Sequence, residues 1–138
     1  MNKEYLFAYG TLRKGYRLDL KKKVAEDIEY IGTAKVKAVL YDVGTYPGAI
    51  KKSGRNEIIG DVFLINNPKK VFKVLDFYEG YSKSNEQSSE FVRRKSITQL
   101  RSGQRLSVWI YWYNFPVAGK PKINYKNYLN FLKYRKTA

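Results

Sequence analysis

The sequence predicts a single α+β domain over residues 1–138. It consists of a largely antiparallel sheet, compatible with a barrel, and a few helices packed on the sheet. Three observations predict this class. Several runs rich in β-branched and aromatic residues are separated by glycine turns, and only two segments have helical patterning. With 43% hydrophobic and 16% aromatic residues, the chain also has enough apolar material for one core.

Five or six strands are expected from the apolar runs. The run at residues 5–9 is apolar on both faces, which indicates a buried strand, and it ends in a glycine turn. Residues 27–43 hold two β-rich runs around Gly32, and residues 58–65 form another, with a loop at 44–48 between them.

The last two strands form a predicted hairpin. Residues 91–100 and 106–115 flank a short connection with Gly103 at its tip, as a hairpin requires. The polar stretch at residues 82–89 precedes the hairpin and is interpreted as a mobile loop.

Two helices are predicted. The first spans residues 68–79, with Asn67 as its cap, proline at its first position and Gly80 at its end. The second runs from about residue 124 to 136 and has one apolar stripe, which we assign to the core. The stripe consists of Tyr125, Tyr128, Leu129 and Leu132.

The composition restricts the possible chemistry. The chain has no His and no Cys, so it lacks disulfides, thiolates, and the commonest general base and zinc ligand. Catalysis would therefore use carboxylates, hydroxyls, amines or backbone groups. The start of the chain lacks a signal-peptide pattern, and its longest strongly apolar stretch, residues 108–113, is far below the roughly 20 residues that span a bilayer. We expect a cytoplasmic protein with no membrane partner.

Positive charge is concentrated at the end of the chain. Residues 91–138 contain 11 basic and no acidic side chains, whereas residues 1–90 contain 16 basic and 12 acidic ones. Such a field attracts anions, and nucleic acid is one partner that it would favour. An ordinary solvated surface of Lys and Arg explains the excess equally well.

Glu79 breaks the pattern of the first helix. On a helical wheel at about 100° per residue, Glu79 falls inside the apolar arc, whereas Asp76 lies on its rim, within reach of water. Burial and the negative end of the helix would both raise the Glu79 pKa. A carboxyl group poised toward neutral pH suits a general acid/base. The alternative is a frayed last turn, with Glu79 in solvent or paired with a lysine. The apolar arc comprises Val71, Phe72, Val74, Leu75 and Tyr78.

Two turns are further candidates. The turn at residues 9–13 (YGTLR) could direct several backbone N–H groups toward one point and so bind a carboxylate or phosphate. Most turns of this kind bind nothing. The segment at residues 46–48 (YPG) is interpreted first as an ordinary tight turn.

Taken in order, four segments resemble the γ-glutamylcyclotransferase-like family of small AIG2-like proteins. They are LFAYGTLR at residues 6–13, YPGA at 46–49, GDVF at 60–63 and LDFYEG at 75–80. The similarity continues through Phe91-Val92-Arg93 and the strand that carries Tyr111. It implies a mostly antiparallel mixed β-barrel with flanking helices, whose cavity holds a γ-glutamyl group.

The resemblance also implies roles for individual residues. Glu79 would be the catalytic acid/base, the same residue that the wheel identifies independently. Phe91 stands where the family's Tyr-x-Arg motif has tyrosine, so one hydroxyl is missing. The backbone N–H groups of the first turn would hold the substrate's α-carboxylate, and Phe91 and Tyr111 would complete the binding site. The residues of that turn are Tyr9, Gly10, Thr11 and Leu12.

The implied reaction is an intramolecular acyl transfer. Glu79 takes a proton from the glutamyl α-ammonium group, the freed amine attacks the γ-amide carbonyl, and a five-membered lactam closes. The products are 5-oxoproline and an amine, and neither a metal nor a cofactor is required. The amine stays open among glutathione fragments, γ-glutamyl amino acids, γ-glutamyl-ε-lysine and γ-glutamyl amines.

Two other functions are compatible with the sequence. One is a non-catalytic module that binds nucleic acid or another polyanion, with Trp109, Tyr111 and Trp112 stacking on bases. These aromatic residues alternate within one strand, so some of them must face the core, and no RNA-recognition signature is present. The other is an inactive family member that binds a glutamyl-like ligand.

Overall fold

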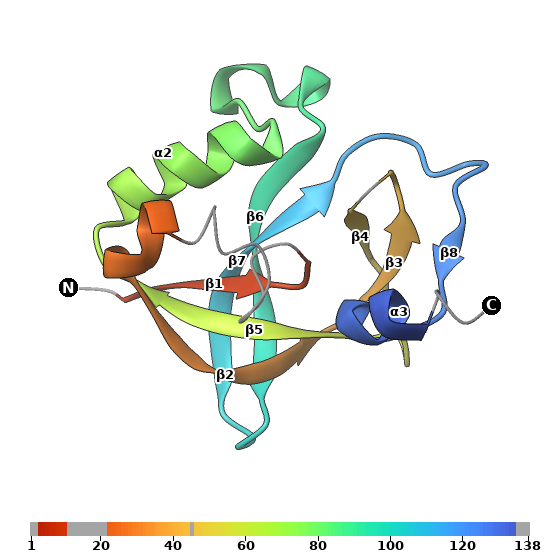
Figure 1. Ribbon diagram of the computed structural model, residues 1–138, viewed down its shortest axis with the longest axis horizontal. Coiled ribbons are helices and arrows are strands. Elements are labelled where there is room, and N and C mark those ends of the chain that lie inside the picture. Colours follow the sequence, from red (N-terminus) through yellow and green to blue (C-terminus); the bar gives the residue numbers. More distant parts are fainter. Residues whose placement is uncertain (1–2, 11–21, 45, 135–138) are drawn as a thin grey trace.

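A closed barrel of five strands forms the centre of the computed structural model, which describes residues 3–10, 22–44 and 46–134. Its strands follow the order β1-β5-β2-β6-β7, and a second sheet has the order β4-β3-β8. Helix α2 covers one side of the barrel, and the second sheet and helix α3 lie on the other side (Figure 1). The barrel strands are β1 (Glu4–Ala8), β2 (Ile28–Val36), β5 (Ile58–Ile65), β6 (Phe91–Leu100) and β7 (Arg105–Tyr113). The remaining elements are β3 (Ala38–Asp42), β4 (Pro47–Lys51), β8 (Lys122–Ile123), α2 (Pro68–Glu79), α3 (Tyr128–Tyr134) and the 3₁₀ helices η1 (Ala25–Asp27) and η2 (Lys83–Ser88).

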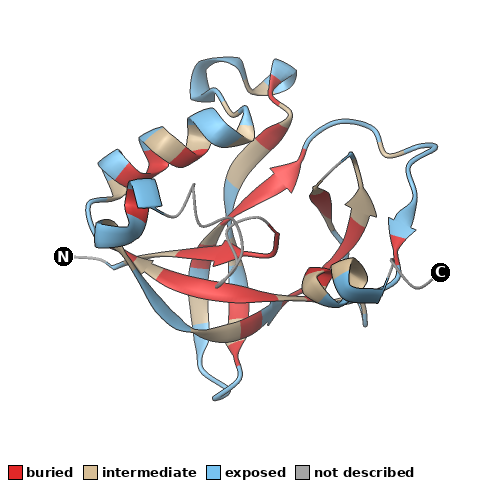
Figure 2. Cartoon of the chain, viewed as in Figure 1, coloured by how far each residue is buried: buried red, intermediate tan, exposed pale blue. Residues whose placement is uncertain are grey.

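Strand β1 is apolar on both faces because it separates two cores. Phe7 and Tyr9 belong to one cluster of buried residues, and Leu6 and Ala8 belong to a second cluster that includes the inner face of α2. Buried residues run along β1 and β5 and along the barrel side of α2 (Figure 2). The barrel is antiparallel except where β1 runs parallel to β7, so the predicted α+β class and its mixed barrel are confirmed.

Strand β2 differs from the prediction of two runs around Gly32. It continues through Gly32, with a bulge between Tyr30 and Gly32, and ends only at Val36. A bulge absorbs an extra residue without ending the strand, so the glycine marks an irregularity within β2 and not its boundary.

The predicted loop at residues 44–48 and the predicted tight turn at 46–48 are both too long, because residues 47 and 48 belong to a strand. Strand β4 begins at Pro47, which pairs with Asp42 of β3, and Gly48 and Ala49 continue the pairing. Proline is tolerated as the first residue of a strand, but Pro, Gly and Ala carry little strand signal. Together with the two-residue β8, this strand brings the described total to eight, above the expected five or six.

The predicted hairpin is present, and the polar stretch that precedes it contains a short helix. Strands β6 and β7 pair from Phe91↔Tyr113 to Gln99↔Arg105. Within the stretch interpreted as mobile, residues Lys83–Ser88 form the 3₁₀ helix η2. Ser89 is buried, and its hydroxyl oxygen accepts a hydrogen bond from the Ser82 N–H at 2.9 Å. The stretch predicted as a loop therefore contains a short helix, and its predicted mobility stays a prediction.

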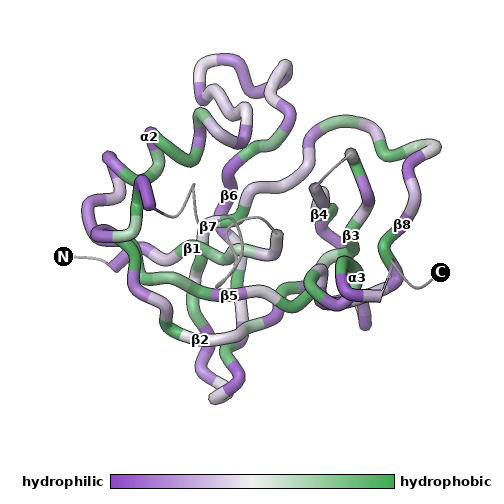
Figure 3. The backbone as a smooth tube through the Cα atoms, viewed as in Figure 1, coloured by the Kyte–Doolittle hydropathy of each residue, from purple (hydrophilic) through white to green (hydrophobic). Residues whose placement is uncertain are grey.

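Helix α2 has the predicted bounds but lacks the predicted N-terminal cap. Asn67 precedes it with a left-handed backbone (φ 55°) and makes no side-chain capping bond, so its predicted side-chain cap is wrong. Gly80 ends the helix at φ 68°, as predicted. Figure 3 shows hydrophobic and hydrophilic residues alternating along α2. Val71, Phe72 and Leu75 are buried on its inner face, whereas Tyr78, predicted in the buried arc, is 37% exposed.

Helix α3 is shorter than predicted. It begins at Tyr128, because the Asn127 side-chain oxygen accepts a hydrogen bond from the Leu129 N–H at 3.0 Å and caps the helix there. Tyr128 is buried, but Tyr125 precedes the helix and is 39% exposed, so the predicted core stripe is only partly realised. The predicted end at residue 136 lies outside the described residues. No helix in the described part of the chain is long and apolar enough to cross a membrane.

Candidate active site

Two motif glycines allow the end of β1, strand β4 and strand β7 to meet closely. A Cβ on Gly10 would lie 2.9 Å from Cγ of Pro47, and a Cβ on Gly48 would lie 2.8 Å from Cβ of Tyr113. Any larger residue at either position would force these elements apart. Gly10 of the first motif is therefore packed against Pro47 of the second, although the two residues are far apart in the sequence.

Tyr9 fixes the end of β1 from within the core. Its hydroxyl donates a hydrogen bond to the Tyr111 carbonyl at 2.5 Å and accepts one from the Ala49 N–H at 3.3 Å. Burial, and next the charge of Glu79, raise the pKa of Tyr9, so its hydroxyl stays protonated. Thr11 and Leu12, two of the four residues predicted to bind the α-carboxylate, lie outside the described residues.

Glu79 is the last residue of α2 and is intermediate in exposure. Burial of the carboxyl group, and next the nearby carboxylates of Glu90 and Asp76, together raise its pKa to about 8. The helix is intact through Glu79, so its last turn does not fray. No described residue forms a hydrogen bond or ion pair with the Glu79 carboxyl group. The side chain is thus held among protein atoms and acidic neighbours.

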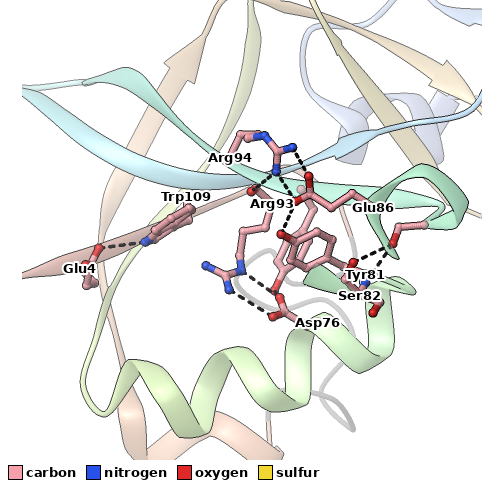
Figure 4. A network of polar contacts seen from close by, with 10 residues as sticks. Glu4, Asp76, Tyr81, Ser82, Glu86, Arg93, Arg94 and Trp109 are labelled. Carbon is pink, nitrogen blue, oxygen red and sulfur yellow. Dashed lines mark hydrogen bonds and ion pairs between the residues drawn. The ribbon is translucent and has the colours of Figure 1, made fainter. Parts of the chain in front are cut away.

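Asp76 lies on the rim of the buried face, as predicted, with 22% of its side chain exposed, and it is also tied to the barrel. Arg93 of β6 donates to it through Nε at 2.9 Å and Nη2 at 3.2 Å (Figure 4). The Tyr111 hydroxyl donates a further bond at 2.6 Å. Arg93 also lies over the rings of Phe72 and Trp109, with its guanidinium carbon 4.0 Å and 4.6 Å from their centroids. The Tyr111 hydroxyl is therefore engaged by Asp76, and burial raises its pKa.

Phe91 lies in an aromatic cluster beside Glu90. Its buried ring is 5.9 Å from that of Tyr46 and 5.4 Å from that of Tyr113, centroid to centroid. The Tyr46 hydroxyl donates a hydrogen bond to Glu90, and burial raises the pKa of Tyr46. Sequence reasoning missed Tyr46 and Glu90 as neighbours of Glu79. The only available signals were the YPG motif and the position of Glu90 immediately before the hairpin.

A cavity of about 400 Å³ lies along the first half of α2. It reaches Asp76 and Arg93, but Glu79 is not among its lining residues. The predicted pocket would join Glu79 to the corner of residues 10 and 11, and Thr11 lies outside the described residues. The cavity is lined by Glu4, Pro68, Lys69, Phe72, Lys73, Asp76, Arg93 and Trp109.

Several basic residues of the last third are paired with carboxylates from earlier in the chain. Arg93 pairs with Asp76, Arg94 with Glu86, Lys95 with Glu4 and Lys126 with Glu57. Two of the three aromatic residues proposed to stack on bases, Tyr111 and Trp112, are buried at 4% and 8% exposure. These observations do not favour the polyanion-binding alternative.

A closed five-strand mixed barrel with a helix packed on one side and a second small sheet on the other (Figure 1) places the chain in the class of small α+β barrel proteins. The chain matches a family described as "Gamma-glutamyl cyclotransferase, AIG2-like" over residues 6–130, and it belongs to that family. A protein of Methanocaldococcus jannaschii named "Putative gamma-glutamylcyclotransferase" is 29% identical over 113 residues, which are 80% of this chain and 84% of the relative.

Solved structures share the fold. YkqA from Bacillus subtilis has a TM-score of 0.72 and 21% identity; the match covers 99% of this chain but only 44% of YkqA. An AIG2-like protein from Mus musculus has a TM-score of 0.69 and 14% identity, covering 91% of this chain and 88% of that protein. At these identities the comparison supports the barrel and its flanking helices.

Proposed function

We propose that the protein is a γ-glutamylcyclotransferase that converts a γ-glutamyl amide into 5-oxoproline and a free amine, with Glu79 as general acid/base. The family supports the reaction class, as does the name of the archaeal relative. The observation that carries the proposal is the state of Glu79: a carboxyl group at the end of α2 whose pKa is raised to about 8.

A base of this strength suits the first step. Peptide α-amino groups have a pKa of about 8, and the neighbouring α-carboxylate of a γ-glutamyl group makes its amine more basic still, so an ordinary glutamate at 4.5 would be too weak a base by more than about three units. Raising the Glu79 pKa to about 8 removes most of this mismatch for proton transfer from the α-ammonium group. The carboxylates of Glu90 and Asp76 also make the neighbourhood attractive to a cationic group.

The proposed steps conserve atoms and charge. The Glu79 carboxylate removes one proton from the α-ammonium group, and the amine nitrogen forms a bond to the γ-carbonyl carbon. The tetrahedral oxyanion then collapses, protonated Glu79 gives its proton to the amide nitrogen, and the original amide C–N bond breaks. The regenerated Glu79 carboxylate takes a second proton from the ring nitrogen and passes it to the released amine, which leaves as an ammonium ion, so the nitrogen of 5-oxoproline keeps one hydrogen. Because nucleophile and electrophile belong to one molecule, the protein mainly folds the substrate and stabilises the oxyanion.

Substrate binding is proposed at the end of β1. The end of β1, fixed by Tyr9 and by the contact of Gly10 with Pro47, would present backbone N–H groups of residues 9–12 to the α-carboxylate. Phe91 and Tyr111 would border the glutamyl chain as an apolar wall, because the Tyr111 hydroxyl is engaged by Asp76.

The test is a panel of γ-glutamyl amides with mass detection of 5-oxoproline. Glu79→Gln keeps the shape of the side chain but removes the base, so turnover should fall by at least about 10²-fold. Glu29→Gln, an exposed substitution on β2, is the matched control and should retain wild-type turnover. Turnover by Glu79→Gln close to wild type would refute the role of Glu79. Binding of the amides without lactam formation by the wild type would identify an inactive glutamyl-binding protein instead.

A further inference from the structure

We propose that Asp76 is a positioning residue for Glu79, anchored to the barrel by Arg93 and Tyr111, and that its ion pair sets the charge seen by the acid/base. This inference rests on the proposed function of Glu79. Asp76 and Glu79 are three residues apart on α2 and so lie on neighbouring turns of one helix face.

The anchor joins the last turns of α2 to two strands. Arg93 of β6 holds both oxygens of the Asp76 carboxylate, and Tyr111 of β7 donates to one of them. In Figure 4 the guanidinium group of Arg93 faces the Asp76 carboxylate above the helix, and the Trp109 ring lies near the same guanidinium group. The Asp76 carboxylate is therefore restrained by three hydrogen bonds, one turn before Glu79.

The same chain of bonds reaches the proposed carboxylate-binding corner. The carbonyl of Tyr111, whose hydroxyl holds Asp76, accepts the hydroxyl of Tyr9, and Tyr9 in turn accepts the Ala49 N–H. Elements β6, α2, β7, β1 and β4 are thus connected through side chains. Movement of the Asp76 anchor would change the distance between Glu79 and the end of β1.

A stabilising role alone does not account for an ion pair at this place. The side chains of Arg93 and Asp76 are only 16% and 22% exposed, and removing two charges this far from water offsets much of their attraction. An apolar pair of similar volume would attach α2 to the barrel equally well. The charge of the pair also affects the protonation of Glu79, because the negative charge of Asp76 raises the Glu79 pKa.

The groups that face Glu79 determine the expected effect of each variant. Among the described residues they are Asp76 on α2, Glu90 before β6, Tyr46 before β4, Tyr9 just after β1 and Tyr111 on β7. Asp76→Asn removes a negative charge and leaves Arg93 unpaired, so the Glu79 carboxyl group should lose its proton at lower pH. Arg93→Gln leaves Asp76 unpaired, so Glu79 should hold its proton to higher pH.

The experiment is an NMR titration of the full chain carrying ¹³C-labelled glutamate, without substrate, with Glu79→Gln used to assign the signal. The midpoint of Glu79 should fall in Asp76→Asn and rise in Arg93→Gln, each by about half a pH unit or more. Arg93→Lys keeps the charge and should return the midpoint to the wild-type value. Tyr111→Phe removes a hydrogen bond but no charge and should leave the midpoint within a few tenths of a unit of wild type.

Opposite shifts in the two charge variants support the proposal, and the pH profile of kcat should move in the same directions. Equal shifts, or none, overturn it, because a purely structural anchor gives no sign reversal. If Asp76→Asn does not fold, Arg93→Gln and Arg93→Lys still decide the sign. Because the titration needs no turnover, an active Glu79→Gln variant would refute the proposed function while the coupling between Asp76 and Glu79 is still measured separately.

Discussion

Replacing Glu79 by glutamine should stabilise the protein, by an amount that increases with pH. The pKa of Glu79 is about 8 in the folded chain, against the ordinary 4.5 of an exposed glutamate. Between these values the folded state binds a proton that the unfolded state has lost. Wild-type stability therefore falls as the pH rises from 4.5 to 8, whereas the variant has no such group.

The magnitude follows from the difference between the two pKa values. A shift from 4.5 to about 8, at 1.36 kcal/mol per unit, corresponds to a penalty of about 5 kcal/mol at full ionisation. At pH 5 the penalty is below about 1 kcal/mol, and at pH 8.5 it is nearly complete. The stability difference between Glu79→Gln and wild type should therefore grow by about 4 kcal/mol over this range, whatever the cost of burying the amide.

The assay is urea unfolding of both proteins at pH 5 and pH 8.5, with circular dichroism as the probe. Glu29→Gln, on the exposed side of β2, is the control for the removal of one negative charge from a strongly basic chain. Its stability relative to wild type should change little over this range. A stability difference for Glu79→Gln that is equal at the two pH values would show that Glu79 titrates normally and would remove the basis for its role as a base.

Further predictions concern activity and packing. Below pH 8, kcat/KM should rise about tenfold per pH unit as Glu79 in the free enzyme loses its proton, and a flat profile would contradict this assignment. Gly48→Ala should lower the free energy of unfolding by about 1–3 kcal/mol, because the added Cβ would lie 2.8 Å from Tyr113. Gly32→Ala, whose Cβ would lie 3.7 Å from its nearest neighbour, should cost less in the same urea-unfolding experiment. Leu75→Ala should cost about 2–5 kcal/mol, since the side chain is fully buried, and a loss under 1 kcal/mol would show that α2 is not packed on the barrel as described.

Local patterns predict the elements whose residues carry strong signals. Strand β1 is recognisable because residues on both of its faces enter a core, and α2 because Pro68 and Gly80 mark its ends. Strand β4 escapes prediction because Pro47 and Gly48 have little strand propensity; close packing against Gly10 and Tyr113 stabilises it instead. Tertiary contacts of this kind have no periodicity that a single sequence displays.

The residues of the candidate site also differ in whether the sequence predicts them. Glu79 is predictable because an acidic side chain on an apolar helix face violates local patterning, and such violations concentrate where function requires them. Its partners are not predictable. The Tyr46–Glu90 pair spans 44 residues and the Tyr111–Asp76 bond spans 35, so neither follows from spacing along one element.

The free-energy penalty of ionising Glu79 in the folded chain explains why α2 is anchored both before and after this residue. A penalty of about 5 kcal/mol at alkaline pH is comparable with the whole stability of many domains, about 5–15 kcal/mol, so a loosely attached helix end would unwind and release the carboxyl group to water. One turn upstream, Asp76 is held by three hydrogen bonds from the barrel. Downstream, the N–H groups of Gly80 and Tyr81 return to the carbonyls of Phe77 and Asp76 and close the helix. Weakening the Gly80 closure should therefore lower the Glu79 pKa by exposing the carboxyl group, whereas removing Arg93 from the Asp76 attachment should raise it, because the negative charge of Asp76 is then unpaired.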